Sequence, residues 1–457
     1  IILIKNHENR IVIIAQADAY IPYDIRQIFY IYKLSFSSLF PNLNAEVLRG
    51  KPLFELDMLC LAYQSSFENF QRKKQTEQYF RKKVHTKVNV KKYLHHTVGS
   101  LMAKVGISNF NIETESIEEI RSRYESGNNF DNIKIEYKDW YIIAQEKAKI
   151  DALAVRYNLD IDTSIINFRF KDYVLNRFGE LSQKIDKDTP ILVSKAMEYI
   201  HENSSKFVII VMDGMSMFDW HIISESFKNI PYEETAVLAM IPTTTSISRQ
   251  CLLSNKYPSQ LIEPWKQSKE KSEFFSCARG FGYREEQIAF ERGYEAEFDP
   301  FVKYGAVIIN DVDDIVHSQK QGKLGMINDI TVLADQGKLA NTTRRFLDMG
   351  LDVYITSDHG NTLCTGMGKL FGTGVEIETK SRRMLVLKDF AEKDAIKEKY
   401  KLIEYPKYYL QKDYDYLLCD VGNSFDARGE EVMTHGGITI DEVIVPFIKI
   451  KAGNYNG

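Results

Sequence analysis

The sequence predicts an α/β protein, with a mainly parallel sheet between layers of helices and a mostly helical domain before it. Two observations predict this class. Short apolar runs, often of β-branched residues, alternate with helical stretches from about residue 191 onward, and such continuous runs are typical of strands buried on both faces. Before that point, apolar residues recur at spacings of three and four, as in amphipathic helices.

Residues 1–190 are expected to form a mostly helical accessory domain. After a short strand at 10–15, apolar residues recur with helical spacing over 53–70 and 140–157. We expect this domain to dock substrate or partner proteins.

A second domain is expected over 191–457. The stretch 182–190, rich in Lys and Asp and ending in Pro, predicts the boundary. A helix is expected at 191–201, and strands then alternate with helical stretches. The expected strands are 207–212, 236–240, 306–309, 353–355, 383–387 and 443–447.

The composition is that of a globular protein with a large core. The chain has 457 residues, of which 44% are hydrophobic and 27% charged, and this length corresponds to roughly three domains at ~150 residues each. These values exclude collagen-like and intrinsically disordered classes. The longest apolar run is far shorter than the ~18 residues that a membrane-spanning helix needs, so we expect no membrane span.

The cysteines indicate a reducing compartment. The five of them are odd in number and show no C-x-x-C or metal-binding spacing. We therefore expect a cytoplasmic location. The chain begins with Ile1 rather than Met, which leaves open that it is a fragment of a longer protein.

The stretch 71–96 of the accessory domain carries a strong positive charge. It holds nine Lys and Arg residues against one Glu, a balance of +8 in a chain whose net charge is -4. Tyr79, Phe80 and Tyr93 are interleaved with these cations. Aromatic faces can stack bases while Lys and Arg neutralise phosphates. We therefore expect the stretch to bind DNA or RNA, with a solvated helix face as the alternative.

Asp, Thr and His residues follow the expected strands of the second domain. Ligands of open α/β sheets bind beyond the carboxyl ends of strands, so we expect these side chains to gather at one edge. Asp and His together suit Zn²⁺ or Mn²⁺. About seven ligands are more than one ion takes, so we expect two divalent ions, with Zn²⁺ favoured and Mn²⁺ or Mg²⁺ as alternatives. The residues concerned lie in Asp213-Gly214, Thr243-Thr244-Thr245, the stretch 310–317 with Asp313 and His317, Asp358-His359 and Thr434-His435.

Asp313 and His317 lie four residues apart, which places them on one face of a helical turn. They can therefore hold the same ion. Taken singly, each of these short motifs is more often a surface turn or an exposed helix pair. Their ordered occurrence after successive strands is what favours a metal site.

The order of the motifs resembles the alkaline phosphatase superfamily, and the stretches 245–250 and 310–317 look most like its PglZ domains. The resemblance covers about 205–450 and implies an alkaline-phosphatase-like core within 191–457. PglZ domains occur in BREX bacteriophage-defence systems and in some response regulators, and the family is associated with metal-dependent phosphoester hydrolysis. The motifs are Asp213-Gly214, Pro242-Thr243-Thr244-Thr245 with Arg249, Asp313 with His317, Ser357-Asp358-His359-Gly360 and Thr434-His435-Gly436-Gly437.

The resemblance implies a role for each residue. Thr245 would be the nucleophile, with Thr243 and Thr244 as rivals, and Arg249 would contact two phosphoryl oxygens. The second ion would activate the water that clears a phosphothreonine intermediate. One ion would be held by Asp213, Thr245, Asp358 and His359, and the other by Asp313, His317 and His435.

A departure from the family pattern falls at the end of the helix that follows Thr245. The family often has Ser-Gly there, whereas this chain has Ser254-Asn255. Because Asn can adopt the left-handed conformation that Gly favours, we expect the helix end to be kept.

The expected substrate is a phosphodiester, such as nucleic acid or a nucleotide, and the expected partners are other defence-system proteins. Two alternatives stay open. The same metal pair serves phosphomonoesterases, sulfatases and phosphomutases, and the sequence does not fix the non-reacting half of the substrate. The chain could also be a catalytically silent structural subunit of a defence complex, although a purely structural site needs no nucleophile.

Overall fold

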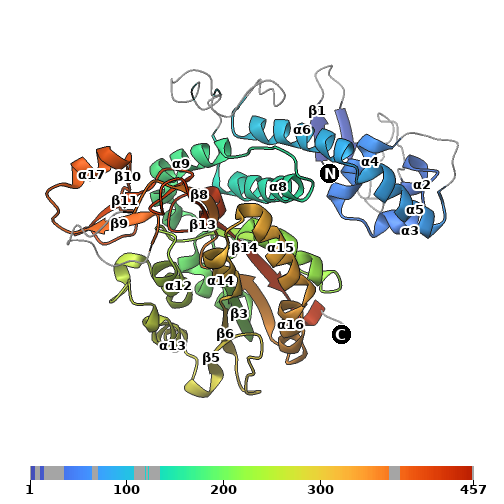
Figure 1. The fold of residues 1–457 in the computed structure, drawn as a ribbon. Coiled ribbons are helices and arrows are strands. Elements are labelled where there is room, and N and C mark those ends of the chain that lie inside the picture. The colour runs from blue at the N-terminus through green and yellow to red at the C-terminus, as the bar shows by residue number, and fades with distance from the viewer. Residues whose placement is uncertain are drawn as a thin grey trace. The chain divides into compact units, whose positions relative to one another are not determined.

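The chain forms two compact units, Ile1–Tyr93 and Leu94–Gly457, which run from blue to red along the sequence in Figure 1. The computed structural model describes residues 2–5, 11–14, 35–63, 70–107, 119, 122, 134–369 and 381–454. The division at 93 and 94 lies well before the boundary expected at 190 and 191. The helices expected over 140–157 therefore belong to the second unit.

The first unit is mostly helical, as expected, with one antiparallel hairpin of β1 (Ile2–Lys5) and β2 (Ile11–Ile14). Asn44 begins α3 by accepting hydrogen bonds from two backbone N–H groups of its first turn. Asn89 joins two elements, because its side-chain amide donates to the carbonyl oxygens of Met58 and Val84 at 3.0 Å each. The helices are α2 (Phe36–Leu39), α3 (Ala45–Arg49), α4 (Leu53–Ala62), α5 (Lys73–Tyr79), the π-helix η1 (Phe80–Val84) and α6 (Lys87–Lys104), which runs past the division.

The aromatic residues of the basic stretch 71–96 lie in the core of the first unit. The exposed fractions of Tyr79, Phe80 and Tyr93 are 6%, 1% and 9%. The prediction that these three rings stack bases is therefore wrong. They mark the apolar faces of amphipathic helices, and all nine Lys and Arg residues of the stretch lie on the exposed faces.

A six-stranded sheet forms the centre of the second unit, in the order β4-β14-β7-β3-β6-β5. β3 is parallel to β6 and β7, and β5 is parallel to β6, whereas β14 is antiparallel to both of its neighbours. Every residue of β3 and β6 is buried, as expected for parallel strands covered on both faces. The strands are β3 (Phe207–Met212), β4 (Glu233–Leu238), β5 (Ile288–Arg292), β6 (Tyr304–Ile309), β7 (Asp352–Thr356) and β14 (Ile444–Ile450).

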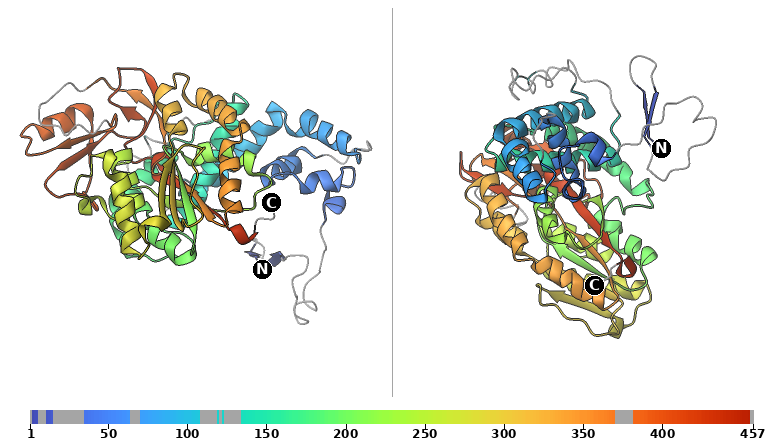
Figure 2. Two further views of the ribbon diagram at one scale, coloured as in Figure 1. Left: turned by 90° about the horizontal axis from the view of Figure 1, so that it is seen from below. Right: turned by 90° about the vertical axis from the view of Figure 1, so that its right-hand side faces the viewer.

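Helices cover both faces of this sheet, which confirms the predicted fold class. In Figures 1 and 2 the sheet lies between one layer with α12 and α13 and another with α15 and α16. Helix α12 ends at Asn255, which has the left-handed conformation, with φ of 55°, as expected. The helices are α10 (Ala196–Asn203), α11 (Met217–Ile223), α12 (Thr245–Ser254), α13 (Glu270–Gly280), α14 (Asp311–Ser318), α15 (Gly322–Asp335) and α16 (Lys338–Asp348).

Helices α8 (Tyr137–Arg156) and α9 (Ile165–Arg177) are joined to the sheet domain by buried polar contacts. Lys147 of α8 lies 2.9 Å from a carboxylate oxygen of Asp151 and 2.7 Å from one of Asp441. Asp441 belongs to α18 (Ile440–Val443), the short helix before β14. These two helices are therefore built into the unit that carries the site.

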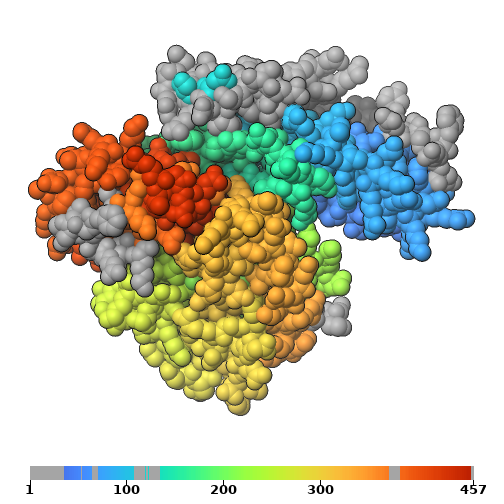
Figure 3. Space-filling view, in the orientation of Figure 1, coloured from blue at the N-terminus to red at the C-terminus, as the bar shows by residue number. Residues whose placement is uncertain are grey.

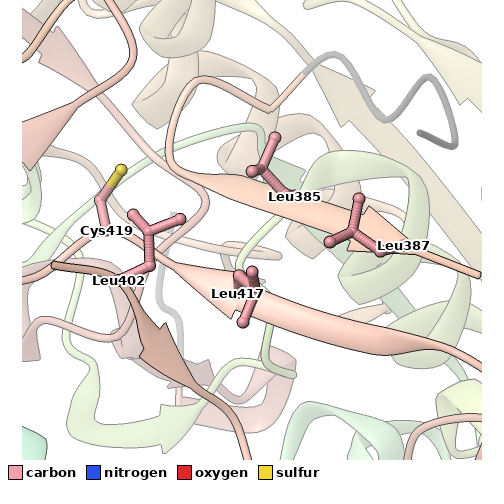
Figure 4. Packing of buried hydrophobic residues seen from close by; sticks show 5 residues of the cluster. All are labelled: Leu385, Leu387, Leu402, Leu417 and Cys419. Atoms are coloured by element: carbon pink, nitrogen blue, oxygen red, sulfur yellow. The ribbon is translucent and has the colours of Figure 1, made fainter. Parts of the chain in front are cut away.

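Two small sheets complete the second unit. One has the order β12-β8-β13 and the other β10-β11-β9. The strand expected at 383–387 is β9 and thus lies outside the central sheet. The sheet of β9 encloses its own apolar cluster of Leu385, Leu387, Leu402, Leu417 and Cys419 (Figure 4). The remaining elements are β8 (Thr362–Gly366), β9 (Met384–Leu387), α17 (Lys393–Tyr400), β10 (Ile403–Glu404), β11 (Asp415–Leu418), β12 (Asn423–Ser424) and β13 (Glu431–Thr434).

Among the described residues, no helix is both long and apolar enough to cross a membrane.

Candidate active site

The predicted site residues meet at one edge of the central sheet. Asp213 follows β3 directly, and Asp358 and His359 follow β7 after one intervening serine. Thr245 is the first residue of α12, which follows β4, and α14 follows β6 with Asp313 and His317. His435 directly follows β13, which packs against α14 and α15. The amber surface of these helices borders the red C-terminal residues in Figure 3. Parallel strand ends thus bring distant parts of the sequence together.

The first group of ligand atoms comes from Asp313, His317 and His435. The Nε2 atom of His317 lies 3.3 Å from Oδ2 of Asp313. The Nε2 atom of His435 lies 3.6 Å from the other oxygen, Oδ1. One ligand atom from each residue lies within 4.8 Å of the other two. The spacing of four on α14 therefore does place two ligands on one face.

The second group lies around His359. Its Nε2 atom is 3.7 Å from Oδ1 of Asp213, 3.9 Å from Oδ2 of Asp358 and 3.0 Å from the hydroxyl oxygen of Thr245. A compact set of ligand atoms is formed here by Asp213, Asp313 and His359. Asp313 therefore belongs to both groups, which the sequence did not indicate. The rings of His359 and His435 are stacked, with centroids 4.1 Å apart.

The buried carboxylates of the site have unsatisfied oxygens. Among the described residues, Oδ1 of Asp213, Oδ1 of Asp313 and Oδ2 of Asp358 have no hydrogen-bond partner. Burial raises the pKa of Asp213 to about 7 and that of Asp358 to about 6, and a neighbouring carboxylate adds to each shift. Such oxygens and such crowded negative charge fit divalent cations well.

Backbone carbonyls orient two of the histidines. Nδ1 of His359 lies 3.0 Å from the carbonyl oxygen of Gly360, and Nδ1 of His435 lies 2.9 Å from that of Thr243. Because a carbonyl oxygen can only accept, each Nδ1 donates to the backbone, and Nε2 is the ring nitrogen that faces the carboxylates. Burial also lowers the pKa of His435 to about 4, which keeps this ring in the form that binds metals.

The three adjacent threonines have different surroundings. The Thr243 hydroxyl donates to the carbonyl oxygen of Gly437 at 3.0 Å and accepts from the N–H of Gly436 at 3.1 Å, so it holds the loop of His435. Thr244 is buried. Thr245 is only partly buried, and its hydroxyl is the one of the three that lies beside a candidate ligand.

Arg249 lies at the site. Its side chain is fully buried, with an exposed fraction of 0%. Its Nη1 atom is 2.5 Å from Oδ2 of Asp213, and its Nε atom is 2.7 Å from Oε2 of Glu270. The spacing of four does place Arg249 one turn beyond Thr245, but the inner face of α12 packs on α13. The guanidinium therefore faces buried carboxylates, and its contact with phosphoryl oxygens stays a prediction.

Several residues that support the site were not predicted. Ser248 donates to the carbonyl oxygen of Asp358 at 2.5 Å. The Ser357 hydroxyl accepts the N–H of Met215 at 2.9 Å, and Asn361 donates to the carbonyl oxygen of Gly214 at 2.9 Å. Ser357 and Asn361 flank the Asp-His pair, and this proximity in sequence was the available signal.

Two glycines allow close approach at the site. A Cβ atom on Gly214, whose φ is 74°, would lie 3.2 Å from the side chain of Asp313. A Cβ atom on Gly360 would lie 2.0 Å from the carbonyl oxygen of Asp441. The loops that carry the candidate ligands are thus packed against neighbouring residues with no room for a side chain at either glycine.

A comparison with protein-family models matches part of the second unit. Residues 289–450 match the family model described as the BREX system PglZ alkaline phosphatase-like domain. The matched range carries Asp313 to His435, whereas Asp213 and Thr245 lie before it. A search of curated proteins finds no match.

Solved structures of low identity were also found. Murine ectonucleotide pyrophosphatase/phosphodiesterase 5 is 11% identical, with a TM-score of 0.39 over 54% of this chain and 88% of that chain. The human protein of the same name is 14% identical, with a TM-score of 0.38 over 54% and 89%. Phosphonoacetate hydrolase from Sinorhizobium meliloti 1021 is 10% identical, with a TM-score of 0.35 over 54% and 90%. The family match supports a PglZ alkaline phosphatase-like domain over residues 289–450, as the order of the motifs predicts.

Proposed function

We propose that the second unit is a divalent-metal-dependent phosphoester hydrolase in which Thr245 is the nucleophile. One observation carries the proposal: the Thr245 hydroxyl lies 3.0 Å from His359, beside two groups of ligand atoms whose carboxylates keep unsatisfied buried oxygens. A site that served structure alone would need no hydroxyl at this position. The PglZ domain supports the general class of phosphoester hydrolase.

Some of the site residues would bind the divalent ions, and Thr245 would attack the phosphorus atom. Divalent ions held by Asp213, Asp358, His359 and Thr245 on one side and by Asp313, His317 and His435 on the other would supply the charge that lowers the pKa of the Thr245 hydroxyl. The N-terminus of α12, where Thr245 lies, favours the negative charge of a phosphoryl group. The Nδ1 contact of His359 with Gly360 fixes its ring beside the attacking oxygen.

The reaction would take two displacements. The Thr245 oxygen forms a bond to phosphorus as the bond to the leaving alcohol breaks, and the hydroxyl proton is released to solvent. Water then attacks the phosphothreonine, which restores the hydroxyl and releases the phosphate product.

For the substrate, we propose a phosphodiester such as nucleic acid or a nucleotide, in a cytoplasmic BREX-type defence system with other defence proteins as partners. The exposed Lys and Arg residues of the stretch 71–96 in the first unit support a polyanionic substrate. The buried aromatics of that stretch do not contribute to this argument.

A panel assay tests the proposal. Chromogenic phosphodiester, phosphomonoester and sulfate ester substrates would each be supplied with Zn²⁺, Mn²⁺ or Mg²⁺. We expect diester cleavage that depends on the ion. Faster cleavage of the monoester or sulfate would assign the domain to the alternative hydrolases, and metal binding without turnover of any substrate would assign it to a structural subunit.

A further inference from the structure

Arg249 is surrounded by acidic side chains at the back of the site. Beside its contacts with Asp213 and Glu270, its Nη1 atom lies 3.8 Å from Oδ2 of Asp358. Its Nη2 atom is buried as well and has no hydrogen-bond partner among the described residues. No nitrogen of this guanidinium therefore reaches solvent from the observed position.

Glu270 anchors the guanidinium from the opposite side. It is the first residue of α13, and its side chain is 2% exposed. One carboxylate oxygen accepts from Nε of Arg249 at 2.7 Å, and the other pairs with Arg292 at the end of β5. An ion-pair chain thus runs from the half-exposed Arg292 through Glu270 and Arg249 to Asp213.

Because of this series of ion pairs, the two carboxylate oxygens of Asp213 have different surroundings. Oδ2 accepts the hydrogen bond from Arg249. Oδ1 has no hydrogen-bond partner among the described residues and lies 3.7 Å from Nε2 of His359. The carboxylate is thereby turned so that a single oxygen faces the other ligand atoms.

We infer that Arg249 is a positioning residue, which Glu270 holds in place so that it orients Asp213 toward a divalent ion. The inference rests on the proposed function of the site. Contact of Nε or Nη1 with the phosphoryl group would require the guanidinium to leave two buried ion pairs, and separating buried ion pairs is strongly unfavourable. Nη2 is the nitrogen left for such a contact, and it is buried. Groups that orient a metal ligand in this way usually affect metal affinity first.

Binding of the phosphoryl group by Arg249 and positioning of Asp213 by Arg249 predict different experimental results. A residue that grips the phosphoryl group affects the KM of the substrate and inhibition by inorganic phosphate, because both ligands carry the group it binds. A residue that orients Asp213 affects the dissociation constant of the ion, and its effect on KM disappears when the ion is saturating.

Glu270→Gln is the main test, because Glu270 contacts Arg249 and lies behind it. Glu273→Gln is the matched control: Glu273 also belongs to α13 and pairs at 2.6 Å with Lys256, which follows α12, but this pair does not contact the site carboxylates. Zn²⁺ binding to the whole chain after chelator treatment would be followed by calorimetry. The KM of a chromogenic diester and inhibition by inorganic phosphate would be measured at saturating Zn²⁺.

We expect Glu270→Gln to weaken binding of one of the two ions by about 10- to 100-fold, with KM and phosphate inhibition at saturating Zn²⁺ within about twofold of wild type. Glu273→Gln should change neither. Equal Zn²⁺ affinity in the two variants, or a raised KM with unchanged Zn²⁺ affinity, would overturn the inference.

Arg249→Lys provides a second test if Glu270→Gln does not fold, because it keeps the charge but cannot reproduce both arms of the guanidinium. It should also weaken Zn²⁺ binding, and unaltered binding would count against the inference. If the proposed function is wrong, the wild type will show no turnover. The Zn²⁺ affinities of wild type and variants can still be compared by calorimetry, because that measurement needs no enzymatic activity.

Discussion

The two groups of ligand atoms differ in their contact with solvent. Asp358 and His359 have exposed fractions of 0%, and Asp213 is nearly as deeply buried. In the other group, the side chain of His317 is 40% exposed and that of Asp313 is 16% exposed. The buried group is further enclosed by Arg249 and Glu270. We call these two the buried group (Asp213, Asp358, His359) and the open group (Asp313, His317, His435), and we count Asp313, which contributes to both, with the open group.

The difference indicates separate tasks for the two groups. Strand ends and helix packing fix the buried group before any ligand binds, so it is suited to holding an ion beside Thr245 permanently. The open group lies on one helix and one loop, where water and substrate can reach the ion. Exchange of ions and entry of substrate are therefore expected on the side of α14.

Removing the ions should have the largest effect. We expect about two divalent ions per chain, and complete loss of hydrolysis on chelation, because the unsatisfied carboxylate oxygens of both groups then lack their counter-charge. Elemental analysis during dialysis against a chelator should show the ion of the open group leaving first. A single ion per chain, or loss of both ions at the same rate, would contradict the proposed difference between the buried group and the open group.

Thr245→Ala should reduce turnover by more than about 1000-fold, because the attacking oxygen is removed. Both groups should keep their ions, since the hydroxyl is one of several ligands. Thr243→Ala is the matched control, and it should lower the melting temperature because two hydrogen bonds are removed, while turnover stays within about tenfold. If Thr243→Ala abolishes turnover while Thr245→Ala retains it, Thr243 rather than Thr245 is the nucleophile.

Lys147→Met tests the support that the buried group receives from α8. The change leaves Asp151 and Asp441 without their buried partner, and the backbone of Asp441 packs directly on Gly360. We expect the free energy of unfolding to fall by about 3 kcal/mol or more, as measured by urea denaturation. Lys149→Met, on the exposed face of the same helix, should change it by less than about 0.5 kcal/mol.

His317→Ala should empty the open group alone. Turnover is expected to fall by about 100-fold, with one ion retained and the melting temperature nearly unchanged, because His317 is exposed. Asp314→Asn serves as the control, since Asp314 is exposed on the same helix. Loss of both ions in the His317 variant would show that the groups act as one site.

The first unit should give the mildest effect on catalysis. Replacing Lys73, Lys74, Lys82 and Lys83 with Glu should weaken binding of a single-stranded oligonucleotide. The log-log slope of affinity against salt should fall by about 0.7 for each phosphate that the protein no longer neutralises. Cleavage of a small chromogenic diester should stay unchanged. Equal oligonucleotide binding by wild type and variant at low salt would favour the solvated helix face.

The site residues that the sequence could predict are those that follow strands directly. Asp213 and Asp358 end up together because parallel strands place their carboxyl ends at one edge, so topology converts sequence order into proximity. The orientation of Arg249 could not be predicted in this way. Helical spacing gives its distance from Thr245, but its direction depends on the packing of α12 against α13.

Interactions between distant segments left no signal in the sequence. Lys147 and Asp441 are 294 residues apart, and nothing in the local pattern of α8 reveals that its lysine is buried. The observed division at 93 and 94 differs from the expected boundary at 190 and 191 for this reason, since periodicity identifies a helix but not the unit on which it packs. The prediction that the aromatic rings of the basic stretch stack bases was wrong for a related reason, because amphipathic helices place rings and cations on opposite faces.

The glycine that follows each of the histidines His359 and His435 has a consequence for redesign. The loop of Gly360 is pressed against the backbone of Asp441, and Gly436 has a φ of 111° with the Ser381 hydroxyl where a side chain would begin. Close packing at these two glycines thus holds the loops of both histidines, and the backbone carbonyls of Gly360 and Thr243 orient the rings. An engineer could therefore diversify the rim of the site to change selectivity while the reaction geometry is inherited intact.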